Sequence, residues 1–366
     1  MEYKRWWLPA CLILILVATS SAVETAYKHS PDWTYRVGGK VNSIKYADNL
    51  VLVGSDDSLL YAISRDGDLV WKYPVDNPVT SVDVADDNIT VTSMDGLIYR
   101  LDPKGNTLWV RELPGYVGYD GGISSGRGII SAGTMNGKVY VLDNDGNQLS
   151  SYDAGGYVIA TRVLDDGILA ITDRHVLVIA DNGSLTTSSE FSSYVRAAKT
   201  TGKYSAVGLS DGRIYLYDNS GVNLWSYDTK DQIGTLYASD NYVAAGTKNK
   251  KLLVFSVNGT LMWERLMTDS VIATFIEEPF IAVSTLDNTV QLYYTDGTLK
   301  WIYATDGRTL DLDMDGRYLL SGTANGGVYF SELPKKSSSE VFLVAGIVVI
   351  VLLLGLLVSI GAVRRV

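Results

Sequence analysis

Cysteine and histidine are almost absent from this 366-residue chain, which contains one cysteine and two histidines. Cys11 lies in an apolar N-terminal stretch that is expected to be removed, so the mature chain should contain neither a disulfide nor a reactive thiol. Lipid attachment at Cys11 is a weaker alternative, because the apolar stretch follows this residue rather than preceding it. His29 and His175 are too few for a multi-histidine metal site.

The chain also lacks an excess of basic residues. Its 31 basic and 41 acidic residues give a net charge of −10 without a run of like charge. Nucleic-acid binding rewards a basic surface, so no nucleic-acid partner is expected. A content of 46% apolar and 20% charged residues excludes a disordered or fibrous chain. The 35 glycines and 24 tyrosines suit a turn-rich all-β protein.

Two segments with apolar stretches lie near the ends of the chain. Residues 1–22 run from a basic head through a short apolar stretch to small residues, which predicts a signal peptide. Residues 341–363 carry no charge and, at about 1.5 Å per helical residue, are long enough for a transmembrane helix. The basic tail 364–366 then belongs in the cytoplasm, after a short linker at 334–340. The sequence predicts a single-pass cell-membrane protein with residues 23–333 on the extracytoplasmic side.

Tryptophan recurs at a fixed distance along the chain. The segment "DGTLKW" ends at Trp301, and the same spacing from glycine to tryptophan ends at Trp71, Trp109, Trp225 and Trp263. A position that we assign to the second strand of each unit recurs at intervals of about 38 residues. Its members are Gly54, Thr92, Gly133, Ala170, Gly208, Gly246, Ser284 and Gly322. Repetition of this length indicates an array of small supersecondary units.

Each repeat contains four short apolar segments typical of strands, separated by hairpin pairs such as Asp95-Gly96. Eight such units predict an eight-bladed β-propeller with four-stranded blades of about 38 residues, because a closed ring leaves few open sheet edges. The last repeat lacks a fourth strand, and Trp33 lies one repeat length before Trp71. We therefore expect strand 32–37 to complete blade eight and to close a monomeric ring.

The repeated tryptophans are predicted to be structural. A platform for a ligand needs one or two aromatic rings at one place, whereas a ring at the same position of six blades is a packing device. The six residues expected between neighbouring blades are Trp33, Trp71, Trp109, Trp225, Trp263 and Trp301. The matching positions of blades three and four are occupied by Ser150 and Thr187.

The Gly-x-x-x-Trp spacing and third strands such as "LLYAIS" and "GKVYVLD" resemble the pyrroloquinoline-quinone-type propeller repeat. The resemblance covers residues 32–333. It implies an eight-bladed propeller, and it is compatible with two kinds of protein. One is a quinoprotein-like dehydrogenase that uses the quinone and calcium. The other is a non-enzymatic, membrane-anchored relative, such as the lipoprotein of the outer-membrane β-barrel assembly machinery.

The sequence disfavours the enzymatic alternative, because the repeats lack two features of quinoprotein enzymes. Many quinoproteins hold the cofactor against adjacent cysteines and carry long insertions with catalytic residues, and neither feature is found here. No enzymatic activity and no cofactor are therefore expected. A calcium ion is the one exception considered, because "DLDMDG" places Asp311, Asp313 and Asp315 at alternate positions before a glycine. A full calcium loop would need a glutamate where Gly322 stands.

Tyrosines gather in the loops that lead into blades three to five. The residues proposed for a binding face are Tyr116, Tyr119, Asp120, Tyr157, Tyr194 and Arg196. Tyrosine and arginine are frequent anchors of protein interfaces. The alternative is that these tyrosines fill the places of the tryptophans missing from blades three and four.

We expect this chain to act as a binding or scaffold module for a protein or an envelope component. The alternative is that this chain is a surface protein that binds glycans. Three sequons, at Asn88, Asn182 and Asn258, would permit glycosylation if the host performs it. The sequence does not name the partner.

Overall fold

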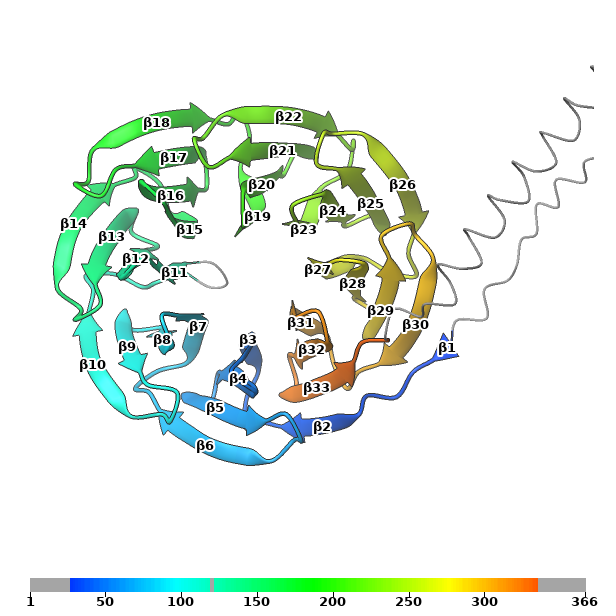
Figure 1. The fold of residues 1–366 in the computed structure, drawn as a ribbon. Coiled ribbons are helices and arrows are strands. Elements are labelled where there is room, and N and C mark those ends of the chain that lie inside the picture. Colours follow the sequence, from blue (N-terminus) through cyan, green and yellow to red (C-terminus); the bar gives the residue numbers. More distant parts are fainter. Residues whose placement is uncertain (1–26, 119–121, 335–366) are drawn as a thin grey trace, which may run out of the picture.

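A computed structural model of the protein describes residues 27–118 and 122–334. These residues form eight sheets, antiparallel except for one short added strand, that are arranged radially around a central axis (Figure 1). Seven sheets have four strands each, and the eighth has a short fifth strand. The predicted eight-bladed β-propeller is therefore confirmed. Within the described residues no helix is long and apolar enough to cross a bilayer, and the predicted signal peptide and segment 341–363 lie outside them.

Each blade runs from an inner strand beside the axis to an outer strand at the rim (Figure 1). The inner strands are β3 (Val41–Ala47), β7 (Val79–Ala85), β11 (Ile123–Gly126), β15 (Val158–Leu164), β19 (Val195–Thr201), β23 (Ile233–Ala238), β27 (Val271–Glu277) and β31 (Thr309–Met314). The second strands are β4 (Leu50–Ser55), β8 (Asn88–Ser93), β12 (Ile129–Gly133), β16 (Gly167–Thr172), β20 (Tyr204–Leu209), β24 (Tyr242–Thr247), β28 (Phe280–Thr285) and β32 (Tyr318–Thr323). The third strands are β5 (Leu59–Ser64), β9 (Leu97–Leu101), β13 (Lys138–Asp143), β17 (His175–Ile179), β21 (Arg213–Asp218), β25 (Lys251–Ser256), β29 (Thr289–Tyr294) and β33 (Gly327–Glu332). The outer strands are β6 (Leu69–Pro74), β10 (Thr107–Glu112), β14 (Gln148–Asp153), β18 (Leu185–Glu190), β22 (Asn223–Asp228), β26 (Leu261–Leu266), β30 (Leu299–Ala304) and β2 (Trp33–Arg36).

The ring is closed by strand β2, which comes from the opposite end of the chain to the rest of blade eight. β2 pairs antiparallel with β33, with Trp33 opposite Phe330 and Arg36 opposite Gly327. The rings of Trp33 and Phe330 stack with centroids 4.9 Å apart. Closure by the N-terminal strand is thus confirmed, and blade eight is held together by pairing rather than by a turn between its third and outer strands.

Five of the tryptophans each join their own blade to the next blade by the same kind of hydrogen bond. The indole Nε1–H donates to a backbone carbonyl in the following blade, in the turn before that blade's outer strand. The pairs are Trp33 with Arg65 at 2.8 Å, Trp71 with Pro103 at 3.2 Å, Trp109 with Asn144 at 2.6 Å, Trp225 with Val257 at 2.8 Å and Trp263 with Thr295 at 2.9 Å. The ring of Trp71 lies against Gly105, where φ is +82° and a Cβ atom would come within 2.9 Å of it. Glycine at this turn therefore allows both the backbone conformation and the close approach of the ring.

Trp301 has a different partner because blade eight has no turn of this kind. The short strand β1 (Tyr27–Lys28) adds to β30 in parallel, with Tyr27 opposite Trp301. His29 then stacks on Trp301, with ring centroids 4.4 Å apart and an interplanar angle of 22°. Only 3% of the Trp301 surface remains exposed. The N-terminal segment thus covers the site that a hairpin turn covers in the other blades.

The stack on Trp301 predicts a pH-dependent contribution to stability. Burial lowers the pKa of His29, although Asp32 opposes the shift, so the folded state favours the neutral imidazole. Because the folded pKa is depressed, this contribution is present above the ordinary value of 6.5 and is lost as the pH falls below it. The thermal midpoint should therefore fall by about 1–2 °C more in the wild type than in His29→Phe between pH 7.5 and 5. Parallel slopes for the two proteins would contradict this assignment.

Neighbouring blades also meet through glycines of the second strands. A Cβ atom on Gly246 would lie 2.4 Å from Cγ1 of Val271, the first residue of the next inner strand. The same contact occurs at Gly54, Gly133, Gly208 and Gly322, each against a valine or isoleucine of the following blade. The repeat position is therefore a close blade-to-blade contact. In blade four the sequence assignment was wrong by one residue, since Ile171 rather than Ala170 pairs with Ala160.

Candidate functional site

One face of the disc is built by two kinds of loop. Because the four strands of a blade alternate in direction, the loops that enter the inner strands and the loops between second and third strands open on the same face. A backbone hydrogen bond joins these two loops in every blade, for example from Met135 N–H to Tyr116 O at 2.8 Å. The equivalent acceptors in the other blades are Lys40, Pro78, Tyr157, Tyr194, Gln232, Ser270 and Arg308. The backbone is thus fixed at these positions, while the side chains differ from blade to blade.

Exposed apolar side chains are concentrated at these positions in four consecutive blades. We call the five of them the tyrosine–methionine surface. It consists of Met94 (43% exposed), Tyr116 (57%), Met135 (47%), Tyr157 (46%) and Tyr194 (58%). Exposed methionine and tyrosine together are typical of surfaces that bind other proteins, since methionine adapts its shape and tyrosine combines an apolar ring with a polar tip.

The sequence candidates fall into three groups. Tyr116, Tyr157 and Tyr194 lie at equivalent loop positions on this face. Arg196 is exposed and lies one residue into β19. Tyr119 and Asp120 lie outside the described residues.

The alternative role of these tyrosines, as replacements for missing tryptophans, does not agree with the structure. The vacant positions are on the outer strands, where Ser150 Oγ donates a hydrogen bond to Asp181 O at 2.9 Å. This bond takes the place of the indole bond in blade three. In blade four, Thr187 lies beside Gly221 of the next blade. Both positions are thus filled without the tyrosines.

Two features of this surface were not expected from the sequence. The guanidinium of Arg174 lies 4.7 Å from the ring centroid of Tyr194, a cation–π contact that orients the exposed ring. Met94, Tyr116 and Met135 border a groove of about 580 Å³. A search of the eight loop pairs for apolar residues would have found both methionines, but only after the pairing of the loops was known.

The groove has an acidic edge. Asp95 accepts a hydrogen bond from Asn77 Nδ2 at 2.9 Å. Burial alone would raise the pKa of Asp95, but hydrogen bonds from Ser93, Asn77 and the Leu97 N–H lower it below its usual value. The carboxylate is therefore ionised at neutral pH, beside an apolar groove. This combination suits an apolar anchor residue that has a basic neighbour.

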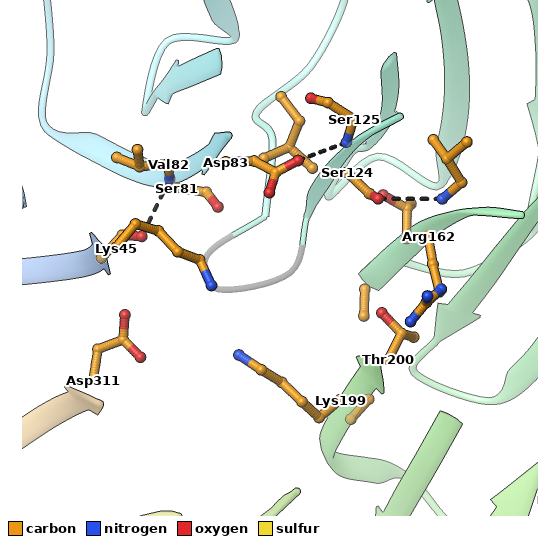
Figure 2. A pocket seen from close by; sticks show the side chains of 16 residues that line it. Lys45, Ser81, Val82, Asp83, Ser124, Ser125, Arg162, Lys199, Thr200 and Asp311 are labelled. Carbon is orange, nitrogen blue, oxygen red and sulfur yellow. Dashed lines mark hydrogen bonds between the residues drawn. The ribbon is translucent and has the colours of Figure 1, made fainter. Parts of the chain in front are cut away.

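A second candidate region lies on the axis of the propeller. Pairing between the inner and second strands places one residue of every blade at the same level: Lys45, Asp83, Ser124, Arg162, Lys199, Tyr237, Phe275 and Asp313. A cavity of about 270 Å³ is lined by residues of blades one to five and by Asp311 of blade eight. Figure 2 shows the tips of Lys45, Lys199 and Arg162 pointing into it. These three cations form no linear motif in the sequence, although an alignment of the inner strands would place them in one column.

The aspartates beside the cavity clamp neighbouring blades. Asp83 accepts the N–H of Ser125 at 2.6 Å (Figure 2), and Asp311 accepts the N–H of Ile44 at 2.9 Å. Asp313 accepts the N–H of Tyr46 at 2.8 Å and lies 3.5 Å from Lys45 Nζ. This proximity raises the pKa of Lys45 above its ordinary value, so that the ammonium stays charged.

The calcium hypothesis finds no support in the arrangement of its three aspartates. Asp311 and Asp313 bind backbone N–H groups of blade one, whereas Asp315 accepts the N–H groups of Arg317 and Tyr318 in its own turn. Over residues 27–118 and 122–334, no three histidine, cysteine, aspartate or glutamate side chains form a group that could hold a metal ion.

Comparisons with known proteins agree on the fold. A family model described as outer membrane protein assembly factor BamB matches residues 19–116 and 210–334, more than half of the chain. The computationally designed Ika8 protein is similar in structure, with a TM-score of 0.74, 18% identity, and coverage of 81% of this chain and 98% of that one. BamB from Moraxella catarrhalis gives a TM-score of 0.71 at 15% identity, covering 83% and 99%. Sqt1 from Saccharomyces cerevisiae gives 0.71 at 13% identity, covering 82% and 98%. No curated protein sequence matches the chain.

Proposed function

Because this chain belongs to the family of the outer membrane protein assembly factor BamB, we propose that it is a protein-binding scaffold of the cell envelope that acts by binding and not by catalysis. The segment 341–363 would anchor it in the membrane, and the propeller would stand on the extracytoplasmic side. A single membrane anchor would hold the disc close to neighbouring membrane proteins, which are the partners we propose.

The tyrosine–methionine surface is the observation that carries this proposal. Its five side chains come from four adjacent blades, so they form one continuous sector on a rigid ring. A scaffold of this kind binds without ordering its own backbone, because the repeated hydrogen bond between the loops already holds them. The groove beside Tyr116 offers a place for an apolar anchor, and the Asp95 carboxylate offers a partner for a basic group next to it.

Site-directed photocrosslinking in native membranes tests this role. A photoreactive phenylalanine analogue at Tyr116 or Tyr194 should give a discrete crosslinked species, whereas the same analogue at Leu149 should not. Leu149 is 56% exposed but lies on outer strand β14. The combined change Met94→Ala and Met135→Ala should lower the yield of the Tyr116 crosslink at least tenfold, since truncating interface anchors costs about 2 kcal/mol or more.

A pair of exposed leucines on outer strands provides the matched control. Leu149→Ala with Leu224→Ala removes similar apolar area from the rim, since Leu224 is 45% exposed, and should leave the crosslinks unchanged. Equal crosslinking from the rim and from the loop face, or no loss in the methionine variant, would contradict the proposal.

A further inference from the structure

The axial cavity is off-centre because the blades fill the axis unequally. At the shared level of the inner strands, blades six and seven contribute Tyr237 and Phe275, which are buried with ring centroids 4.3 Å apart. Burial of its ring raises the pKa of Tyr237 to about 12, so the phenol stays neutral. These two aromatic side chains occupy the axis at this level on the side of blades six and seven, where Phe275 also borders a second cavity of about 200 Å³. The cavity of about 270 Å³ lies against the cationic residues of blades one, four and five.

Arg162 is the unusual member of this lining. Its Nε atom is buried without a hydrogen-bond partner among the described residues, and no carboxylate of those residues is within ion-pairing distance of its guanidinium. Burial lowers the pKa of Arg162. A half-buried guanidinium without a carboxylate is unfavourable for folding, and such groups are retained where a ligand supplies the missing acceptor.

The other groups of the wall suit the same kind of ligand. Figure 2 shows Lys199 and Thr200 on the adjacent blade, with the Lys199 ammonium pointing into the cavity with the Arg162 guanidinium. The hydroxyl oxygen of Ser124 accepts the N–H of Val163 at 3.2 Å, which leaves its own proton to donate. Asp83 and Asp311 stand elsewhere in the wall and can accept hydrogen bonds from hydroxyl or amino groups.

We propose that the axial cavity binds a small anion carrying a carboxylate or phosphate group, with the Arg162 guanidinium as its bidentate anchor and Lys199 as a second cationic contact. A guanidinium fork matches two oxygens of either group. The site is distinct from the tyrosine–methionine surface, so it stands or falls independently of the scaffold proposal.

Calorimetric titration of the purified full-length chain tests this site with two probes, inorganic phosphate and malonate, at constant ionic strength set with chloride. The protein carries a net charge of −10, so general attraction of anions is disfavoured and saturable 1:1 binding reports a built site. Arg162→Gln should weaken the better probe at least thirtyfold. Arg162→Lys should weaken it about tenfold, because it keeps the charge and loses the fork.

The matched control is Arg127→Gln. Arg127 does not line the cavity, and its guanidinium lies 2.8 Å from the carboxylate of Asp181. The affinity of this variant for the probe should equal that of the wild type. Saturation by phosphate alone would identify a phosphate site, and saturation by malonate alone a carboxylate site. Absence of saturable binding for both probes, or unchanged affinity in a folded Arg162→Gln protein, would overturn the proposal.

The thermal midpoint of the ligand-free protein provides a second test. A ligand-binding role and a structural role for Arg162 predict opposite changes of this midpoint in Arg162→Leu. If this arginine awaits a ligand, Arg162→Leu should raise the thermal midpoint of the ligand-free protein and abolish the further rise caused by the better probe. If it holds the blades together, Arg162→Leu should lower the midpoint, and the proposal fails.

Discussion

Deleting residues 32–36 should lower the thermal midpoint of the protein by more than 10 °C. The deletion removes β2, whose four residue pairs with β33 close the ring. It also removes the Trp33 ring from Phe330 and the indole hydrogen bond to Arg65 O. Loss of an outer strand, an aromatic pair and the strand pairing that closes blade eight should cost about 5 kcal/mol, a large part of the stability of an ordinary domain.

A second deletion of the same length separates ring closure from the covering of Trp301. Removing residues 27–31 takes away β1 and His29 but keeps β2. It should lower the midpoint by only about 2–4 °C, which corresponds to roughly 1 kcal/mol. Thermal unfolding followed by circular dichroism compares the midpoints of the two deletion proteins. Hydrogen exchange should show loss of protection in blades eight and one when residues 32–36 are deleted. Equal midpoints for the two deletions would mean that β2 contributes no more to the ring than β1.

Gly246→Ala should lower the free energy of unfolding by about 2 kcal/mol, and Gly246→Val by more. The new Cβ atom would lie 2.4 Å from Cγ1 and 2.5 Å from Cβ of Val271. Val271 begins the next inner strand and is 2% exposed, and a β-branched side chain cannot turn away from the clash. Overpacking of a close contact costs about 1–3 kcal/mol. Urea denaturation should show the lower midpoint with an unchanged slope.

Gly126→Ala is the matched control for this prediction. Gly126 is also a strand glycine, in β11, but a methyl group added there would have Cγ1 of Val163 as its nearest neighbour at 3.8 Å, an ordinary contact distance. This change should be neutral or slightly stabilising, because alanine restricts the unfolded chain. A loss of stability in Gly126→Ala comparable to that in Gly246→Ala would show that the effect comes from replacing glycine in a strand and not from the blade contact.

The architecture of the propeller could be predicted from the sequence because its signals are local and periodic. The spacing of Trp71 and Trp109, the hairpin pairs and the spare strand before the first repeat together determine the number of blades and the point of closure. Each of these signals lies within one repeat length, so one-dimensional reasoning reaches it. The one-residue error at Ala170 arose where blade four lacks both a glycine and a tryptophan to mark the register.

The tertiary structure alone decided where the candidate sites lie. Met135 and Tyr116 become neighbours through a loop-to-loop hydrogen bond that has no signature in the sequence. Lys45 and Arg162 converge because strand pairing turns one residue of each inner strand toward the axis, and they come from blades that are far apart in the chain. His29 covers Trp301 through a parallel strand that follows no repeat. The sequence by itself thus determined the ring, because periodic packing specifies it, whereas the surfaces and the cavity depend on contacts between different repeats.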